Sequence, residues 1–317
     1  MRIHLFLLHL RLASRLAFVA LLLFFVVCCS APQQQENKKE NFASPGQQPE
    51  SRQEEKAGST ESAIVSEEPD PPALPEQSDT AETPVPLAVR PKEDKSEKTK
   101  PRIAIIIDDM GYHEQIGLQL LGLDLNLTFA FLPGAPHTVE QADLAFARKR
   151  DILVHLPMQP KSEQWDPGPG ALLLKYSREE LYRQTEKLLA KVPHSVGANN
   201  HMGSEFTENR NAMHSVLLAL QKQSLFFIDS FTTAHSTGLS EARKMGIPAA
   251  RRHVFLDNAH DMAKVRRQIQ ELVTRAHSKG HAIGIGHPHT ATLAALTECS
   301  RTLLASVEIV GVHALVR

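Results

Sequence analysis

Cysteine is scarce in this chain, which has only three among its 317 residues: Cys28, Cys29 and Cys299. Residues 101–317 contain Cys299 alone, so no disulfide can form within them. The stability of that region must therefore come from packing rather than from covalent cross-links.

A surplus of positive charge is also absent, because the formal net charge is −1. A nucleic-acid-binding protein normally carries a basic field on its surface. The charge balance therefore argues against anionic polymers as partners.

Residues 1–30 contain three arginines and then the apolar run LAFVALLLFFVVCCS. This run is short for a membrane span of about 20 residues and has the design of a signal peptide. A cleaved signal, an uncleaved anchor and lipidation at Cys28 or Cys29 remain open, although the residues before Cys28 are bulky for a lipidation site. Each reading predicts export to the periplasm or cell envelope.

Residues 31–100 are rich in Gln, Glu, Pro, Ser and Lys and have hardly any aromatic side chains. Such a segment cannot bury enough apolar surface to offset the entropy lost on ordering. We expect a disordered tether, with a partner-binding linker as the alternative.

Residues 101–317 alternate short apolar runs with amphipathic stretches. The eight predicted strands are RIAIII, NLTFAFL, DILVHL, SVGANN, LFFIDS, PAARRHVF, HAIGIG and VEIVGV, and the predicted helices are TVEQADLAFARKR, SREELYRQTEKLLAKV, NAMHSVLLALQKQ and DMAKVRRQIQELVTRAHSKG. Parallel strands need crossover helices, so this alternation indicates a parallel β/α fold. An irregular barrel of seven to eight strands suits about 215 residues better than an open doubly wound sheet.

Polar residues recur where these strands end. They are Asp108, Asp109, His155, Asn199, Asn200, His201, Asp229 and His287. The carboxyl ends of parallel strands meet at one mouth of a barrel, so we expect these side chains to share a cavity.

Asp108 and Asp109 are adjacent like charges, which a divalent cation would hold together. Neighbouring residues on a strand point in different directions, so one carboxylate can bind the ion while the other accepts a proton from the water that the ion activates. One aspartate with His155 and His201 is a ligand set that suits Zn²⁺. The alternative for Asp109 is a helix N-terminal cap.

The segments IAIIIDDMG, HLPMQP, GANNHMGSEFT, FFIDSFTT, RRHVFLDN and AIGIGHPH, in this order, resemble the divergent polysaccharide deacetylases. These are relatives of the metal-dependent NodB-type carbohydrate esterases. The resemblance covers nearly all of residues 102–317. It implies an irregular NodB-like (β/α) barrel whose relatives remove acetyl groups from polysaccharides with a divalent metal.

The resemblance also implies roles for individual residues. It maps the catalytic base onto Asp108, a metal ligand onto Asp109 and the general acid onto His287. The related esterases take both histidine ligands from one His-x-x-x-His segment, whereas this chain offers His155 alone there and His201 further on. The arginine motif that orients the base in those relatives is not evident, and Gln159 stands where the divergent family often has an acid.

The leading hypothesis is therefore a metal-dependent hydrolase that removes acetyl groups from an envelope glycan. We expect Asp229 to orient His287 or to contact substrate, and Asn199 or Asn200 to donate to the carbonyl oxygen. Ser204 is expected at the rim of the site.

Three alternatives remain. The same cleft could bind a glycan or a protein partner without hydrolysis, and His289 could add a second metal site with His287. A metal phosphoesterase is weaker, because no phosphate-cradling glycine loop follows the first strand.

Overall fold

The computed structural model describes residues 100–317. The predicted leader, residues 1–30, and the predicted tether, residues 31–100, lie outside the described residues except for Lys100. In the described part of the chain, no helix is long and apolar enough to cross a membrane.

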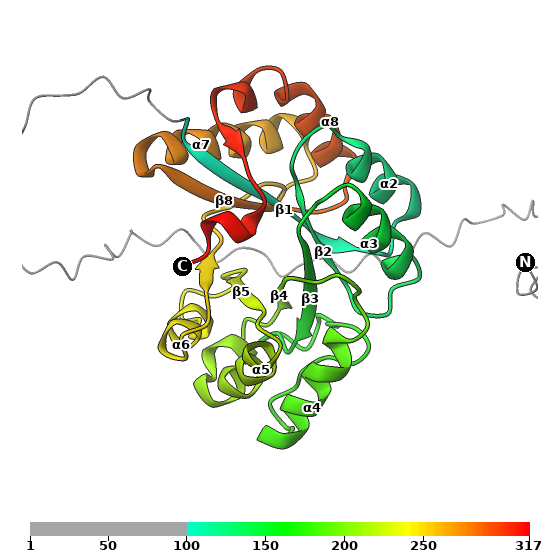
Figure 1. The fold of residues 1–317 in the computed structure, drawn as a ribbon, viewed down its shortest axis with the longest axis vertical. Helices are drawn as coiled ribbons and strands as arrows, with labels where there is room; N and C mark the ends of the chain where they lie inside the picture. Colours follow the sequence, from blue (N-terminus) through cyan, green and yellow to red (C-terminus); the bar gives the residue numbers. More distant parts are fainter. Residues whose placement is uncertain (1–99) are drawn as a thin grey trace, which may run out of the picture. The chain divides into compact units, whose positions relative to one another are not determined.

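Within residues 100–317, nine parallel strands form one sheet, and helices cover its outer face (Figure 1). The strands are β1 (Arg102–Met110), β2 (Thr128–Phe131), β3 (Ile152–Met158), β4 (Gly197–Met202), β5 (Phe226–Asp229), β6 (Ala249–Arg251), β7 (Val254–Phe255), β8 (His281–Gly286) and β9 (Glu308–Ile309). Eight of them follow the order β6-β5-β4-β3-β2-β1-β8-β7, and β9 pairs with β1 beside this path. The predicted irregular barrel is thereby confirmed.

The barrel is incomplete between β6 and β7, which are consecutive in sequence but are not paired with each other among the described strands. The segment PAARRHVF, predicted as one strand, is in fact two. The main chain crosses the gap at this point, because Arg252 N donates to Asp229 O of β5 and His253 N donates to Ile283 O of β8. β6 therefore belongs to one edge of the sheet and β7 to the other.

The helices are α2 (Glu114–Gly122), α3 (Thr138–Ala147), α4 (Arg178–Leu189), α5 (Arg210–Lys222), α6 (Gly238–Lys244), α7 (Met262–Lys279) and α8 (Thr290–Cys299). Four of them were predicted, whereas α2, α6 and α8 were not. α4 begins with a capping box in which Ser177 and Glu180 bond each other's backbone N–H. α7 ends at Gly280, whose φ of 83° is the left-handed conformation that favours glycine.

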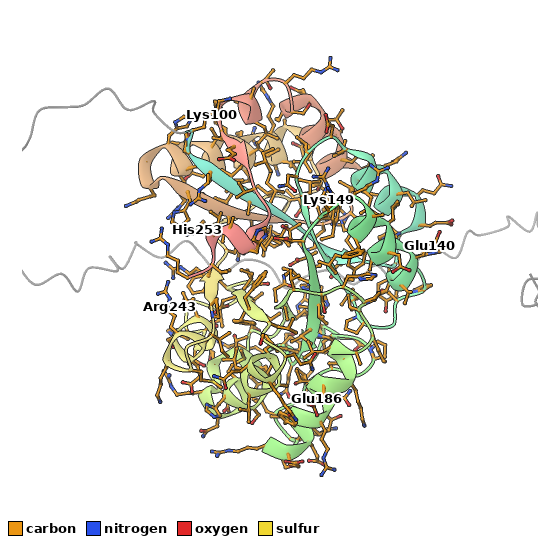
Figure 2. All side chains as sticks on the ribbon, viewed as in Figure 1. Lys100, Glu140, Lys149, Glu186, Arg243 and His253 are labelled. Atoms are coloured by element: carbon orange, nitrogen blue, oxygen red, sulfur yellow. The ribbon has the colours of Figure 1, made fainter. Side chains whose placement is uncertain are left out.

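The alternating side chains of β1 divide the core into two parts. Ile103, Ile105 and Ile107 pack outward in the larger cluster between sheet and helices. Ala104 and Ile106 point into a smaller cluster inside the curled sheet, which Val312 and Leu315 from the C-terminal segment help to fill. Charged side chains such as those of Glu140, Lys149 and Arg243 lie on the exposed outer surface (Figure 2).

Candidate metal centre and catalytic site

A bulge in β1 positions the two adjacent aspartates. Ile107 pairs with Phe129 and Met110 pairs with Phe131, so the register shifts between Ile107 and Met110. Asp109 has a φ of 53°, a left-handed conformation that is uncommon for a residue other than glycine. Backbone strain of this kind is often found at functional sites, and here it turns the two carboxylates in different directions.

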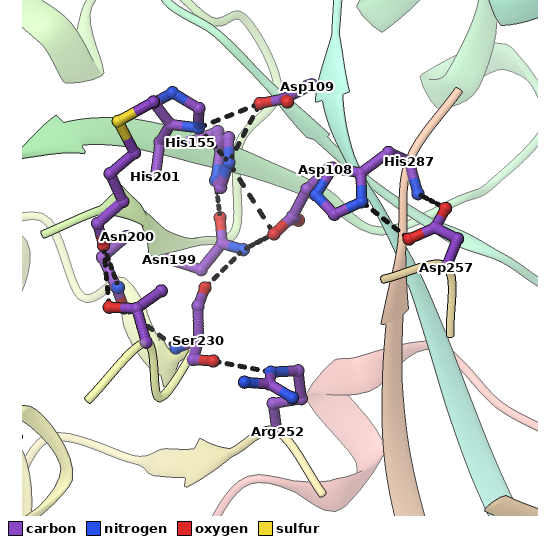
Figure 3. A network of polar contacts seen from close by, with 12 residues as sticks. Asp108, Asp109, His155, Asn199, Asn200, His201, Ser230, Arg252, Asp257 and His287 are labelled. Atoms are coloured by element: carbon purple, nitrogen blue, oxygen red, sulfur yellow. Dashed lines mark hydrogen bonds and ion pairs between the residues drawn. The ribbon is translucent and has the colours of Figure 1, made fainter. Parts of the chain in front are cut away.

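Asp109, His155 and His201 direct one atom each toward a common point (Figure 3). His155 Nε2 lies 3.3 Å from Asp109 Oδ1, His201 Nδ1 lies 3.0 Å from the same oxygen, and the two ring nitrogens are 3.2 Å apart. The histidines come from the neighbouring strands β3 and β4, and His155 lies within β3 rather than at its end as we had expected. The predicted ligand set is therefore brought together.

Asn199 fixes the proton on His155. The amide nitrogen of Asn199 faces the carboxylate of Asp108, at 2.8 and 2.9 Å from its two oxygens. Asn199 Oδ1 must then accept from His155 Nδ1, which lies 2.9 Å away. With the proton on Nδ1, a neutral His155 directs the lone pair of Nε2 toward Asp109 and His201.

A divalent cation fits this arrangement. Asp109 Oδ1 is buried and accepts no hydrogen bond of acceptable geometry, although two ring nitrogens lie beside it. Ligand atoms about 2.0–2.1 Å from one ion would lie about 2.9 Å apart at octahedral angles and about 3.3 Å apart at tetrahedral angles. The three observed separations fall in this range, and a positive ion would remove the repulsion between the lone pairs.

Electrostatics at Asp109 also favour a bound cation. Burial by itself would raise the pKa of Asp109, but the imidazoles of His201 and His155 beside it outweigh this effect and hold the pKa well below its usual range. The side chain of Asp109 is therefore ionised, which is the form that a metal requires of a carboxylate ligand. It is not a helix cap, because α2 begins at Glu114 with His113 at its N-cap position.

A second group, Asp257, His287 and His289, could also hold an ion by proximity alone. Its carboxylate is already engaged, however, because Asp257 Oδ1 lies 2.9 Å from His287 Nδ1 and Oδ2 accepts from His287 N and Thr292 Oγ1. The group of Asp109, His155 and His201 therefore fits an ion better than this second group.

Asp108 lies beside the proposed ion position. Its Oδ2 is 3.7 Å from His155 Nε2, and the side chain is fully buried. Because Asn199 donates to its carboxylate, Asp108 is held in one orientation next to the three convergent atoms.

Asp257 takes the position that we had expected for Asp229. It follows β7 and contacts His287, which follows β8. Burial would raise the pKa of Asp257, but the charge and hydrogen bonds of His287 lower it. Sequence reasoning missed Asp257 because PAARRHVF was treated as a single strand, although RRHVFLDN contains it just beyond a strand end.

Asp229 holds a loop together. Its Oδ1 accepts from Phe231 N at 2.9 Å, and its Oδ2 accepts from Ser236 Oγ at 2.7 Å and from Leu239 N at 3.0 Å. Burial raises the pKa of Asp229 against the effect of these hydrogen bonds. These contacts give it a structural role at the start of the loop after β5.

The residues predicted to bind substrate are buried at the same end of the sheet, and each has partners within the protein. Asn200 Nδ2 donates to Met202 O and its Oδ1 accepts from Ser230 N. Ser204 Oγ accepts from Lys161 N. Their contact with substrate stays a prediction, and the observed contacts hold the loops around the site.

Gln159 is also engaged. Its Nε2 donates to Glu205 Oε2 at 2.6 Å, so a carboxylate lies beside the position where the divergent family often has an acid.

A shallow pocket lies next to His201. Apolar side chains dominate its lining, among them Tyr112, Leu132 and Pro157.

The chain belongs to the divergent polysaccharide deacetylase family, whose model matches residues 105–316. The uncharacterized protein YibQ of Escherichia coli strain K12 is 35% identical over 214 residues, which cover 68% of this chain and 67% of that protein. An uncharacterized protein of Haemophilus influenzae is 35% identical over 210 residues, which cover 66% of this chain and 75% of that protein.

The fold is also similar to that of a solved structure, protein ATU2773 from Agrobacterium tumefaciens C58. The TM-score is 0.66 at 25% sequence identity, and the match covers 69% of this chain and 91% of that chain. The resemblance inferred from the six sequence motifs is thereby confirmed at the level of family and fold.

Proposed function

We propose that this protein is a metal-dependent hydrolase that removes acetyl groups from an envelope polysaccharide. The observation that carries the proposal is the convergence of Asp109 Oδ1, His155 Nε2 and His201 Nδ1, with Asp108 next to them. Membership of a deacetylase family supports acetyl groups as the target.

One oxygen and two nitrogen ligands suit Zn²⁺, which polarises a carbonyl and makes water nucleophilic near neutral pH. Asp108 is the proposed base. It lies beside the ligand atoms without being one of them, and it takes the proton that the attacking water loses.

His287 is the proposed general acid. Asp257 accepts a hydrogen bond from Nδ1 and thereby fixes the ring, so that Nε2 delivers a proton to the leaving amine or alcohol.

The substrate is proposed to be a glycan of the cell envelope, such as peptidoglycan. The support is the signal-like sequence of residues 1–30, which predicts export. The polar segment that follows would let the domain reach its substrate from an N-terminal attachment.

The test is acetate release by the full chain from peptidoglycan and from chitooligosaccharide. We expect release by the zinc-loaded protein, loss of release after chelation, and recovery when zinc is restored. A zinc-loaded protein that retains glycan in a pull-down but releases no acetate would reject hydrolysis and support the binding alternative.

A further inference from the structure

The side chain of Asn199 is fully buried between two functional groups from different strands. On one side, Nδ2 donates to both oxygens of Asp108 at 2.8 and 2.9 Å. On the other side, Oδ1 lies 2.9 Å from His155 Nδ1. Its second N–H points toward Ser230 Oγ at 3.3 Å, so every polar group of the amide is used.

We propose that Asn199 is a positioning residue that couples the proposed base Asp108 to the metal ligand His155. The inference rests on the proposed function for the role of Asp108, whereas the effect on His155 concerns metal binding alone. It gives Asn199 a task different from the contact with substrate that the sequence suggested.

An amide is suited to this position because it has donors on one side and an acceptor on the other. A carboxylate needs donors, and the Nδ1–H of a metal-binding histidine needs an acceptor. A neutral side chain without an amide would leave at least one of these two buried partners without its hydrogen bond.

The orientation of Asp108 needs such a donor because Asp109 is its neighbour in sequence and carries a like charge. Asn199 supplies a donor to Asp108 in a chain whose sequence lacks an evident arginine motif for orienting the base. The guanidinium of Arg252 donates to the carbonyl oxygens of Ser230 and Phe231. It thereby supports the loop that carries Ser230, a partner of Asn199.

The experiment compares the full chain with Asn199→Leu and Asn199→Asp. Leucine has a similar size and can neither donate nor accept. Aspartate keeps an acceptor for His155 but replaces the donor that faces Asp108. Thr185→Val, which removes a buried hydroxyl within α4, is the control for loss of a buried polar group.

Metal binding tests the His155 side without any assay of activity. We expect the zinc dissociation constant to rise about 10- to 100-fold in Asn199→Leu and to stay within about threefold in Asn199→Asp. Nitrogen-15 NMR of the zinc-free protein should show the His155 proton on Nδ1 in the parent and a mixture of tautomers in Asn199→Leu. Unchanged zinc affinity with an unchanged tautomer in Asn199→Leu would overturn the proposal.

Turnover at saturating zinc tests the Asp108 side. We expect both Asn199 variants to lower kcat about 100-fold with little change in KM. In an Asp108→Asn background the effect of Asn199→Leu on kcat should disappear, because its partner is already gone. Fully additive losses would contradict the coupling.

The two readouts separate this inference from the proposed function. If the parent chain releases no acetate, hydrolysis is rejected, and the zinc and NMR results still decide whether Asn199 controls His155. If Asn199→Leu does not fold, the kcat of Asn199→Asp tests the role of Asn199 as a donor to Asp108. A wild-type kcat in Asn199→Asp at full zinc occupancy would reject that role.

Discussion

Asp257 Oδ1 lies 2.9 Å from His287 Nδ1 although 30 residues separate them in sequence. We predict that Asp257→Asn lowers kcat at least about tenfold, because the ring loses the buried charge that fixes it. Zinc affinity should change by less than about threefold, since Asp257 is not among the proposed ligands. Acetate release and zinc titration measure the two effects.

Asp151 provides the matched control for Asp257. It also contacts a histidine, His313, but that histidine is exposed and Asp151 precedes β3 at the opposite end of the sheet from the site. Asp151→Asn should leave both kcat and the zinc affinity unchanged. Full activity in Asp257→Asn would remove His287 from the proposed mechanism.

The adjacent aspartates should respond differently to the same substitution. Asp109→Asn should weaken zinc binding at least about tenfold, because it removes the charged ligand. Asp108→Asn should leave zinc bound and lower kcat about 100-fold or more, because it removes the base. Zinc content and acetate release are measured on both variants, and equal loss of metal in the two would refute the division of roles.

Replacing Gly197 or Gly122 by alanine should change the stability of the fold in opposite directions. A Cβ on Gly197 would lie 2.6 Å from ring atoms of Phe226, so Gly197→Ala should destabilise the fold by about 1–3 kcal/mol. A Cβ on Gly122, near the end of α2, would meet nothing within 4 Å. Gly122→Ala should therefore stabilise the fold by about 0.4–1 kcal/mol. Urea unfolding measures the free energy of unfolding of both variants. Similar changes in the two would contradict the packing argument.

His253, which is labelled in Figure 2, should make the free energy of unfolding depend on pH. Burial, with positive charge on Arg275 and His281, lowers the pKa of His253 from 6.5 to about 4, and its Nδ1 accepts from Ile283 N. Between these pH values the unfolded chain binds a proton that the folded chain does not. The contribution of His253 is therefore fully present above pH 6.5 and is lost as the pH falls toward 4.

The amount lost should be about 1–3 kcal/mol of unfolding free energy. Urea unfolding of the parent and His253→Asn between pH 7.5 and 4.5 measures it, and the variant should show the shallower dependence. His277→Asn, on the exposed part of α7, controls for the loss of an imidazole. Parallel curves for the parent and His253→Asn would refute the prediction.

The strand predictions succeeded where a pattern is local. RIAIII and HAIGIG are short apolar runs bounded by polar residues, and each became a strand at that place. The prediction failed at PAARRHVF, because Arg252 and His253 bond to opposite edges of the sheet. No local sequence pattern indicates to which edge of the sheet a backbone N–H will donate its hydrogen bond.

The sequence by itself determined the parallel β/α architecture and the group of polar residues at one end of the strands. The architecture follows from the periodicity of apolar residues, which short stretches of sequence already show. The grouping of the polar residues follows because the carboxyl ends of parallel strands lie at one end of the sheet. Only the tertiary structure decided that Asp109 adopts a left-handed backbone, that Asn199 joins Asp108 to His155, and that Asp257 rather than Asp229 contacts His287. These relationships depend on distances of about 3 Å between atoms of residues far apart in the chain, and hydrogen bonds are lost when such distances change by a fraction of an ångström.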